Sequence, residues 1–482
     1  MSEEIIKKEI EAENPAEKAE DKKAEAPVTA KPVKEKLSFT ADNKDTVFAA
    51  VFIIGTFIGF SWGLCDGFRL GFSISHIAAF IAGSIYFVKK ETHPGIFGCV
   101  CGLLSLLSAV PCAVTSDYTV RILSILAAVA LEWVWFASLS GKGKTNGDLG
   151  LAELLLGCFS HGVTDMLVSL KTIVKGEGSE NKKAVKGIAG VLCSIPVLCI
   201  VIPLLAESDA AFEGLVSSFI PDPSSLVGEL IATVFIAPFI IGFAVSLKHR
   251  KKTAFDFKKP KGIDTAFLSA FFGVLSLCYL VYLFSQTAYF FSAFSGLLPE
   301  GYKLTFADYA RRGFFELCYI AGINLVLIFL MIILAKKKNE KLPAVLKVFG
   351  CFIGIFTLAI IATAISKMVM YIDNYGMTVL RLGTSAFMIF MAVVFIAVII
   401  RCFTDKVKIL HTALITASVI LIALGAVDIR AVAAKYNYNA YVSGKLSGID
   451  VAYYYSLGEE GVPYLIKLLD DKDYSDQAKI NL

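Results

Sequence analysis

One acidic residue stands well inside a long apolar segment. Glu132 lies just past the middle of the apolar residues 120–140, between Leu131 and Trp133. A carboxyl group in lipid is costly unless it finds a partner, so such a residue is a functional-site hypothesis by default. The alternative is a protonated or hydrogen-bonded carboxyl near an interface, where Trp133 and Trp135 anchor the helix. The sequence leaves both interpretations open.

Two groups of polar residues border later apolar segments. On one helical face of the first group lie Tyr309, Arg312, Gly313 and Glu316. Within it, Arg312 and Glu316 are spaced to pair at i, i+4. The charged and aromatic members of the second group are Lys367, Tyr371, Asp373, Tyr375 and Arg381. Helix-end charges and interfacial aromatic residues explain such groups without function; the functional interpretation is a polar pocket where charges of different helices pair.

Sequence signatures of catalysis and cofactor binding are absent. The chain has no His-Glu-x-x-His and no Cys-x-x-Cys. Residues 143–145 mimic the end of a phosphate-binding loop, but Ser138 stands where that motif needs its first glycine. His161 and Asp165 share a helical face, yet two ligands are too few for a metal site. We therefore expect no cofactor and no metal.

Composition places the chain in a membrane. Hydrophobic residues make up 56% of it, charged residues 18%, and the mean hydropathy is +0.68, against about 45–50% and about 25% in soluble domains. Segments near the length of about 20 residues that crosses a bilayer must be helices, because lipid offers the backbone no hydrogen bonds. The net charge of +4 resides between apolar runs and does not indicate a nucleic-acid partner. The eleven predicted spans are 47–65, 72–88, 96–114, 120–140, 187–206, 226–247, 264–286, 313–335, 344–366, 379–400 and 408–427.

Basic residues alternate between the loops. If the N-terminus is cytoplasmic, the inner loops have 24 lysines and arginines in or beside them and the outer loops have 7. Basic residues favour the cytoplasmic side. A miscounted span would exchange the sides of all later loops, so the consistent bias supports the count. We predict a multi-pass cell-membrane protein with a cytoplasmic N-terminus and an extracytoplasmic C-terminus.

Residues 151–175 form an amphipathic stretch. Apolar residues recur there at three- and four-residue spacing, and polar residues such as Glu153 and His161 interrupt them. This pattern predicts a helix that lies in the cytoplasmic interface. The competing interpretation is a re-entrant or twelfth span, which would break the charge alternation.

The two ends of the chain are polar. Residues 1–44 contain nine lysines and eleven acidic residues, too little apolar surface to offset the entropy of ordering, and are predicted to be disordered. The Tyr-rich residues 428–482 are predicted to form a small helical tail on the outer membrane face. The sequence therefore predicts an all-α polytopic bundle of about 11 helices, 45–427, between these two segments.

Four stretches carry a resemblance to known bacterial membrane proteins. They are residues 45–49, 204–212, 309–317 and 371–381, and the third is the most specific. On them the chain resembles the domain-of-unknown-function families DUF4173 and DUF4153. The resemblance covers nearly everything after the N-terminal arm. It implies an architecture and no reaction, because these families have no assigned activity.

The charge alternation places the distinctive polar residues on one side of the membrane. We predict an outer-face pocket lined by Asp209, Gln286, Tyr309, Arg312, Glu316, Lys367, Tyr371, Asp373 and Arg381. Besides the lipid bilayer, its partner would be a lipid headgroup, a small ligand or an envelope protein. The leading hypothesis is a non-enzymatic module for sensing, scaffolding or envelope maintenance. A small-solute or ion transporter built around Glu132 is the second hypothesis, and a membrane enzyme acting on a lipid-linked substrate is the third.

Overall fold

In the computed structural model the described residues form helices joined by turns and short irregular segments, and the described β pairing is an isolated bridge between Ile263 and Ala335. The chain divides into two units, residues 1–38 and 39–482, and the helices that the structure describes belong to the second. The predicted disordered arm lies largely outside the described residues. The structure describes residues 37–66, 69–89, 92–145, 147–175, 190, 194, 197, 201–219, 226–251, 255, 257, 262–295, 314–337 and 341–470.

Among the described residues, ten helices are long and apolar enough to cross a membrane, which confirms an all-α polytopic bundle. Nine of them coincide with predicted spans, and the tenth is α7 (Gly150–Lys175). The first predicted span corresponds to α2 (Asn43–Asp66), whereas the predicted span 187–206 falls mostly outside the described residues. The nine are α3 (Leu70–Phe87), the joined α4 (Ile96–Leu107) and α5 (Ala109–Val114), α6 (Tyr118–Leu139), α10 (Leu226–His249), α11 (Thr265–Ser295), α13 (Phe314–Leu334), α14 (Ala344–Tyr375), α15 (Val379–Phe403) and α16 (Ile409–Ala426).

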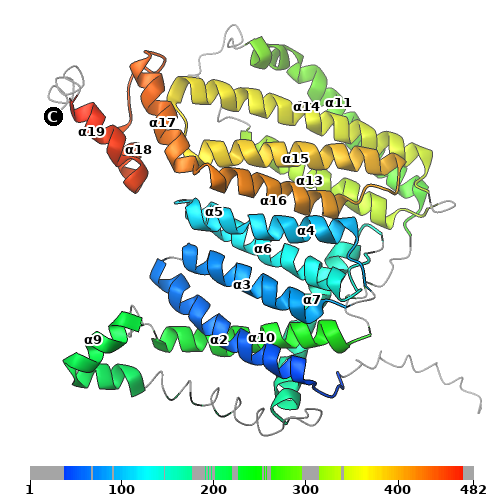
Figure 1. Ribbon diagram of the computed structural model, residues 1–482. Coiled ribbons are helices and arrows are strands. Elements are labelled where there is room, and N and C mark those ends of the chain that lie inside the picture. Colours follow the sequence, from blue (N-terminus) through cyan, green and yellow to red (C-terminus); the bar gives the residue numbers. More distant parts are fainter. Residues whose placement is uncertain are drawn as a thin grey trace, which may run out of the picture. The chain divides into compact units, whose positions relative to one another are not determined.

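Successive spans reverse direction, so the turns gather at two ends of the bundle (Figure 1). We call one of these the Lys-rich end; it contains the described residues of the connections 88–95, 140–149, 250–264, 335–343 and 404–408. At the opposite end lie the turns 115–117 and 376–378 and the chain after α16. The loops that are rich in basic residues in the sequence therefore lie at one end of the bundle, and the loops with few basic residues lie at the other. Which end faces the cytoplasm stays a prediction.

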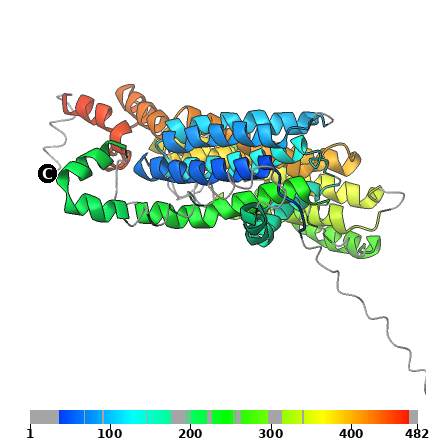
Figure 2. The same ribbon diagram turned by 60° about the horizontal axis from the view of Figure 1, so that its bottom comes forward.

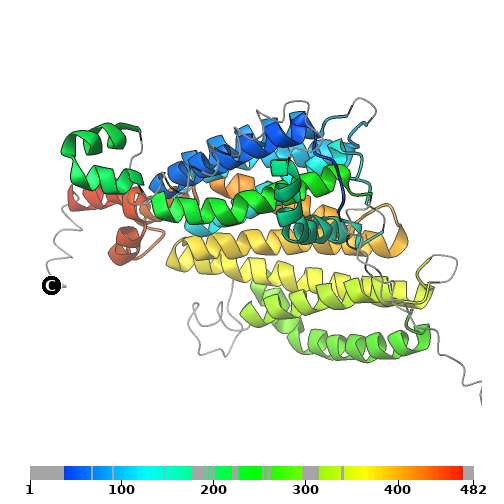
Figure 3. The same cartoon turned by 90° about the horizontal axis from the view of Figure 1, so that it is seen from below.

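Two groups of helices build two apolar cores (Figure 3). The first core joins α11, α13, α14 and α15 through buried side chains such as Phe272, Ile328 and Phe395. The second joins α2, α3, α4, α6, α7 and α10. Helix α16 lies between the groups: Ile409 belongs to the first core, while Leu414 packs against the second. Burial of these apolar faces leaves other apolar side chains exposed, as expected for helices that face lipid.

Helix α7 runs across its neighbours. Figure 2 shows it almost end-on, whereas α10 lies along the page. The two helices cross at glycines: a Cβ atom on Gly242 of α10 would lie 2.6 Å from the carbonyl oxygen of Gly162 of α7. This crosswise course at the Lys-rich end agrees with a helix in the membrane interface, although length and composition alone also suit a span. Its depth in the membrane stays a prediction.

Helix α14 continues nine residues beyond the predicted end of its span, from residue 366 to Tyr375. Its 32 residues are about 48 Å long at about 1.5 Å per residue, more than the hydrocarbon thickness of about 30 Å. Lys367, Tyr371 and Asp373 therefore stand on its last turns. After α16 come the short helices α17 (Ile429–Val442), α18 (Val451–Ser456) and α19 (Val462–Asp470), which we call the tail helices.

Candidate functional site

The turn between α14 and α15 holds three of the predicted pocket residues. The Arg381 guanidinium stacks on the Tyr371 ring, with its carbon atom 4.0 Å from the ring centre. It also donates hydrogen bonds to the carbonyl oxygens of Tyr375, at 2.9 Å, and Gly376. These carbonyls follow the end of α14, where a cation is favourable. Tyr371 and Arg381, predicted from sequence to line one site, are thus in contact.

Asp373 turns toward the tail helices instead. Its carboxylate accepts hydrogen bonds from Lys445, at 2.7 Å, and from the Tyr436 hydroxyl, at 3.2 Å. The pair with Lys445 is exposed to solvent, so its direct contribution to stability is small. Its hydrogen bond with Asp373 raises the pKa of Lys445. A carboxylate held in this way is positioned for docking the tail.

The tail helices bind the backbone of the same turn. The buried Asn437 of α17 accepts a hydrogen bond from the Met377 amide, at 2.6 Å, and donates one to the Met377 carbonyl, at 2.8 Å. The Val379 amide donates to the Tyr453 hydroxyl, at 3.0 Å. Gly376 adopts a φ of +77° and a Cβ there would meet Asn437 at 2.7 Å, so glycine is required. The turn and the tail are therefore fitted to each other.

The other predicted pocket residues are not brought to this turn by any described contact. Asp209 is exposed and caps α9 (Ala210–Phe219) by accepting hydrogen bonds from the amides of Ala211 and Phe212. Lys367 stands half-buried on α14. Tyr309 and Arg312 lie outside the described residues, as do the side chains of Gln286 in α11 and Glu316 in α13. The nine-residue pocket as a whole stays a prediction.

Glu132 does have a partner, which the sequence analysis did not identify. His76 of α3 places Nδ1 3.5 Å from the Glu132 carboxylate, and both side chains are buried. The other ring nitrogen of His76 lies 3.1 Å from the carbonyl oxygen of Ser105 in α4. The second carboxylate oxygen of Glu132 accepts no hydrogen bond from any residue that the structure describes. Three helices thus surround one buried acid–base pair.

The Lys-rich end contains buried ion pairs that sequence reasoning missed. Asp165 of α7 accepts two hydrogen bonds from the Arg250 guanidinium, at 2.6 and 2.7 Å, and one from Ser246, at 2.6 Å. At the start of α2, the fully buried Asp45 accepts hydrogen bonds from Lys248, at 2.6 Å, and from Tyr86, also at 2.6 Å. Basic residues that end α10 therefore bind specific carboxylates in addition to setting topology.

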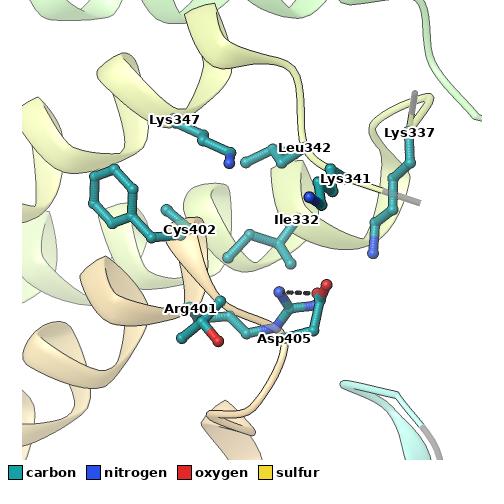
Figure 4. A pocket seen from close by; sticks show the side chains of 10 residues that line it. Ile332, Lys337, Lys341, Leu342, Lys347, Arg401, Cys402 and Asp405 are labelled. Carbon is teal, nitrogen blue, oxygen red and sulfur yellow. Dashed lines mark ion pairs between the residues drawn. The ribbon is translucent and has the colours of Figure 1, made fainter. Parts of the chain in front are cut away.

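A third ion pair borders a recess at the same end (Figure 4). Arg401 donates two hydrogen bonds to Asp148, at 2.7 and 2.8 Å, and also pairs with Asp405. The Asp148 bond joins the α6–α7 connection to α15, 253 residues away. The recess has a volume of about 310 Å³, counting the solvent-open space at its mouth, and is lined by Lys337, Lys341, Leu342, Lys347, Arg401 and Asp405, among others.

A comparison with protein families matches residues 99–468 to "Domain of unknown function (DUF4153)". The chain belongs to the DUF4153 family. Membership of DUF4173, the second family that the sequence resembles, is not shown. No curated protein and no solved structure matches the chain.

The DUF4153 match extends from α4 to α19. It therefore includes Glu132, the α14–α15 turn and the tail helices, whereas His76 and Asp45 precede it. Within the described part of this DUF4153 protein, no group of three His, Cys, Asp or Glu side chains could hold a metal ion. The family membership supplies no reaction, so the function must be argued from these contacts.

Lys142 gives the Lys-rich end a testable pH dependence. It donates hydrogen bonds to the carbonyl oxygens of Leu247 and Arg250 at the end of α10. Burial, with repulsion from Lys89, lowers its pKa from 10.5 to about 8; the neutral amine still has two hydrogens to donate. Between these pH values the folded protein binds fewer protons than the unfolded chain, so the free energy of unfolding should rise with pH.

The measurement compares the thermal unfolding midpoints of the wild type and Lys142→Met in the same detergent across this pH range. As pH rises, we expect the unfolding midpoint of the wild type to increase relative to that of Lys142→Met. A difference independent of pH would show that Lys142 titrates as it does in the unfolded chain.

Proposed function

We propose that this protein is a non-enzymatic membrane scaffold or sensor that presents its tail helices at the end of the bundle opposite the Lys-rich end. The observation that carries the proposal is the paired hydrogen bonding of Asn437 with Met377. A buried amide bonded to both backbone groups of one residue fixes the tail's position on the α14–α15 turn. Catalysis does not require such docking, but display of a surface to a partner does.

The start of the tail supports the proposal from a second side. Asp428 accepts hydrogen bonds from the backbone amide of Ser116, at 2.9 Å, and from its hydroxyl, at 3.1 Å. Asp428 adopts a φ of 41°, a strained conformation for a residue with a side chain. The tail is thus tied to the α5–α6 turn and to the α14–α15 turn, which belong to different helix groups. It would report any change in their relative position.

The tail also offers a surface for a partner. Tyr455 is 83% exposed and Leu469 is 74% exposed, whereas Tyr454, which packs against Tyr464 of α19, is 1% exposed. Exposed tyrosine and leucine side chains on a docked element are typical of residues that bind another protein. We propose that the partner is an envelope protein and that it binds the tail helices at the level of the lipid headgroups.

The docking is tested with Asn437→Ala. We expect the loss of two hydrogen bonds from a buried amide to cost about 1–3 kcal/mol, so amide hydrogen exchange in residues 429–470 should accelerate roughly 5- to 150-fold. Asn439→Ala is the matched control, because Asn439 is exposed on the same helix. Equal exchange in both variants would contradict the docking role of Asn437.

The scaffold role is tested by cross-linking in cells from a photoreactive residue at Tyr455 or at Leu469. We expect discrete heavier species from both positions in the wild type and their loss in Asn437→Ala. The same residue at the buried Tyr454 is the negative control. If the exposed positions give no product, or the products persist in Asn437→Ala, the scaffold proposal is wrong.

The pair of Glu132 and His76 favours a second candidate, a transporter of a small solute or ion. Intramembrane ionisable pairs mark ion and proton pathways in transporters. The protein reconstituted in vesicles with a trapped pH-sensitive dye tests this candidate. Proton movement that is lost in Glu132→Gln would favour transport over the scaffold, whereas identical traces for both proteins would exclude proton transport through this pair.

A further inference from the structure

The surroundings of His76 determine where one of its protons lies. Its Nε2 atom is 3.1 Å from the carbonyl oxygen of Ser105 and 3.2 Å from the Ser105 hydroxyl oxygen. The carbonyl can only accept a hydrogen bond. The hydroxyl donates its own hydrogen to the carbonyl of Ala128, at 3.0 Å, and so can only accept from the ring. Nε2 therefore carries a hydrogen.

The gap between His76 and Glu132 needs a second proton. Nδ1 of His76 lies 3.5 Å from Oε2 of Glu132. Without a proton between them, the nitrogen lone pair would face a carboxylate and leave a net charge of −1 buried. With one proton, the pair is neutral overall, whether the proton is on the ring or on the carboxyl. An isolated buried charge costs several kcal/mol, so the pair retains this proton.

The carboxyl is the better place for it. Among the described residues, Oε1 of Glu132 has no hydrogen-bond partner, and the Glu132 side chain is 9% exposed. A carboxylate anion would leave charge on that oxygen without a donor, whereas a neutral carboxylic acid leaves only an unpaired carbonyl, which costs less.

We propose that Glu132 and His76 form a proton-binding site in the interior of the bundle, in which Glu132 is a neutral carboxylic acid that donates toward Nδ1 of a neutral His76. The site binds one proton between α3 and α6. The inference does not depend on the scaffold role of the tail, and it names the proton as the ligand for the transport candidate.

Few other ionisable groups face this site in the described structure. From α4 the polar neighbour of His76 is the hydroxyl of Ser105, which also donates to the Ala128 carbonyl of α6. Arg121 lies three turns earlier on α6 and donates to the carbonyls of Thr115 and Ser116 in the turn before that helix. On α3, the ring of Phe72 stacks on His76, 5.6 Å between centres. The proton's energy is therefore set by the pair itself.

Infrared difference spectroscopy of the full-length protein in lipid vesicles tests the proposal. The carbonyl stretching band of a protonated carboxyl group is separate from that of a carboxylate. We expect the wild type at neutral pH to show one such band that Glu132→Gln removes. Glu153→Gln makes the same kind of change at a half-buried glutamate of α7 and should leave the band unchanged. Absence of a Glu132-dependent band at neutral pH would overturn the proposal.

His76→Gln gives the second measurement. If Glu132 donates to His76, removal of Nδ1 should shift the frequency of the Glu132 band, because the carboxyl loses its acceptor. An unshifted band would overturn the pairing. Glutamine resembles the neutral acid in shape and charge, so Glu132→Gln should fold. If its thermal unfolding midpoint equals that of the wild type, a lost band reports the removal of the carboxyl group and not misfolding. Vesicle flux is measured separately, so failure of the transport candidate and failure of this site are distinguishable.

Discussion

Asp165→Ala is expected to destabilise the protein by about 3–5 kcal/mol, the usual cost of removing one partner from a buried ion pair. The Asp165 and Arg250 side chains are 5% and 14% exposed. Without the carboxylate, the Arg250 guanidinium loses both hydrogen bonds that it donates to Asp165, and Ser246 loses its acceptor. Chemical or thermal unfolding in detergent, followed by circular dichroism, measures the loss.

A double-mutant cycle separates the pair from general damage to α7. Arg250→Met keeps an apolar chain in the same place but removes the charge. We expect Asp165→Ala combined with Arg250→Met to cost clearly less than the sum of the two single changes. Additive losses would mean that Asp165 and Arg250 are not coupled and that the ion pair does not hold α7 on α10.

The helical spans were predictable because lipid leaves the chain little choice. A segment of about 20 apolar residues must satisfy its own backbone hydrogen bonds, so hydropathy alone located nine of the ten candidate spans. Helix α14 extends beyond the predicted span 344–366. Lys367 and Asp373 interrupt the apolar run, yet the helix continues to Tyr375, because polar residues at a membrane surface end a span without ending a helix.

The pairing of polar residues was less predictable than their location. Tyr371 and Arg381 were expected near each other and are in contact. Asn437, which fixes the tail on the same turn, was not singled out, since one asparagine in a Tyr-rich segment carries no signal of its own. Its hydrogen bonds cross 60 residues of sequence, and only the packing of the tail on the bundle brings these groups together.

The basic residues at the Lys-rich end were expected only to set the topology, but they also form ion pairs. Lys248, Arg250 and Arg401 were counted for topology, where the partner of each charge does not matter. In the structure they bind Asp45, Asp165 and Asp148. A signal was available: each acid lies in or just before an apolar or amphipathic segment, where a carboxylate needs a cation. Similarly, His76 within an apolar segment was the natural candidate partner for Glu132.

Gly242→Leu is expected to cost more than about 3 kcal/mol, since it combines overpacking with separation of α7 from α10. The added Cβ alone would lie 2.6 Å from the Gly162 carbonyl oxygen and 2.7 Å from the Met166 Cα. Both are backbone atoms, so no side-chain rotation relieves the contact. Moving α7 outward would also lengthen the hydrogen bonds between Asp165 and Arg250. The effect should therefore exceed that of an ordinary core substitution.

Two alanine variants make the test specific. Gly383 lies in α15, and a Cβ there meets nothing within 4 Å. Gly383→Ala should be neutral or stabilising by up to about 1 kcal/mol, because alanine has a higher helix propensity than glycine. Gly242→Ala makes the identical change at the crossing and should instead destabilise, and its loss should be coupled to that of Asp165→Ala. If both alanine variants gain stability, α7 does not cross α10 at Gly242, and the anchoring of the Lys-rich end through that crossing is wrong.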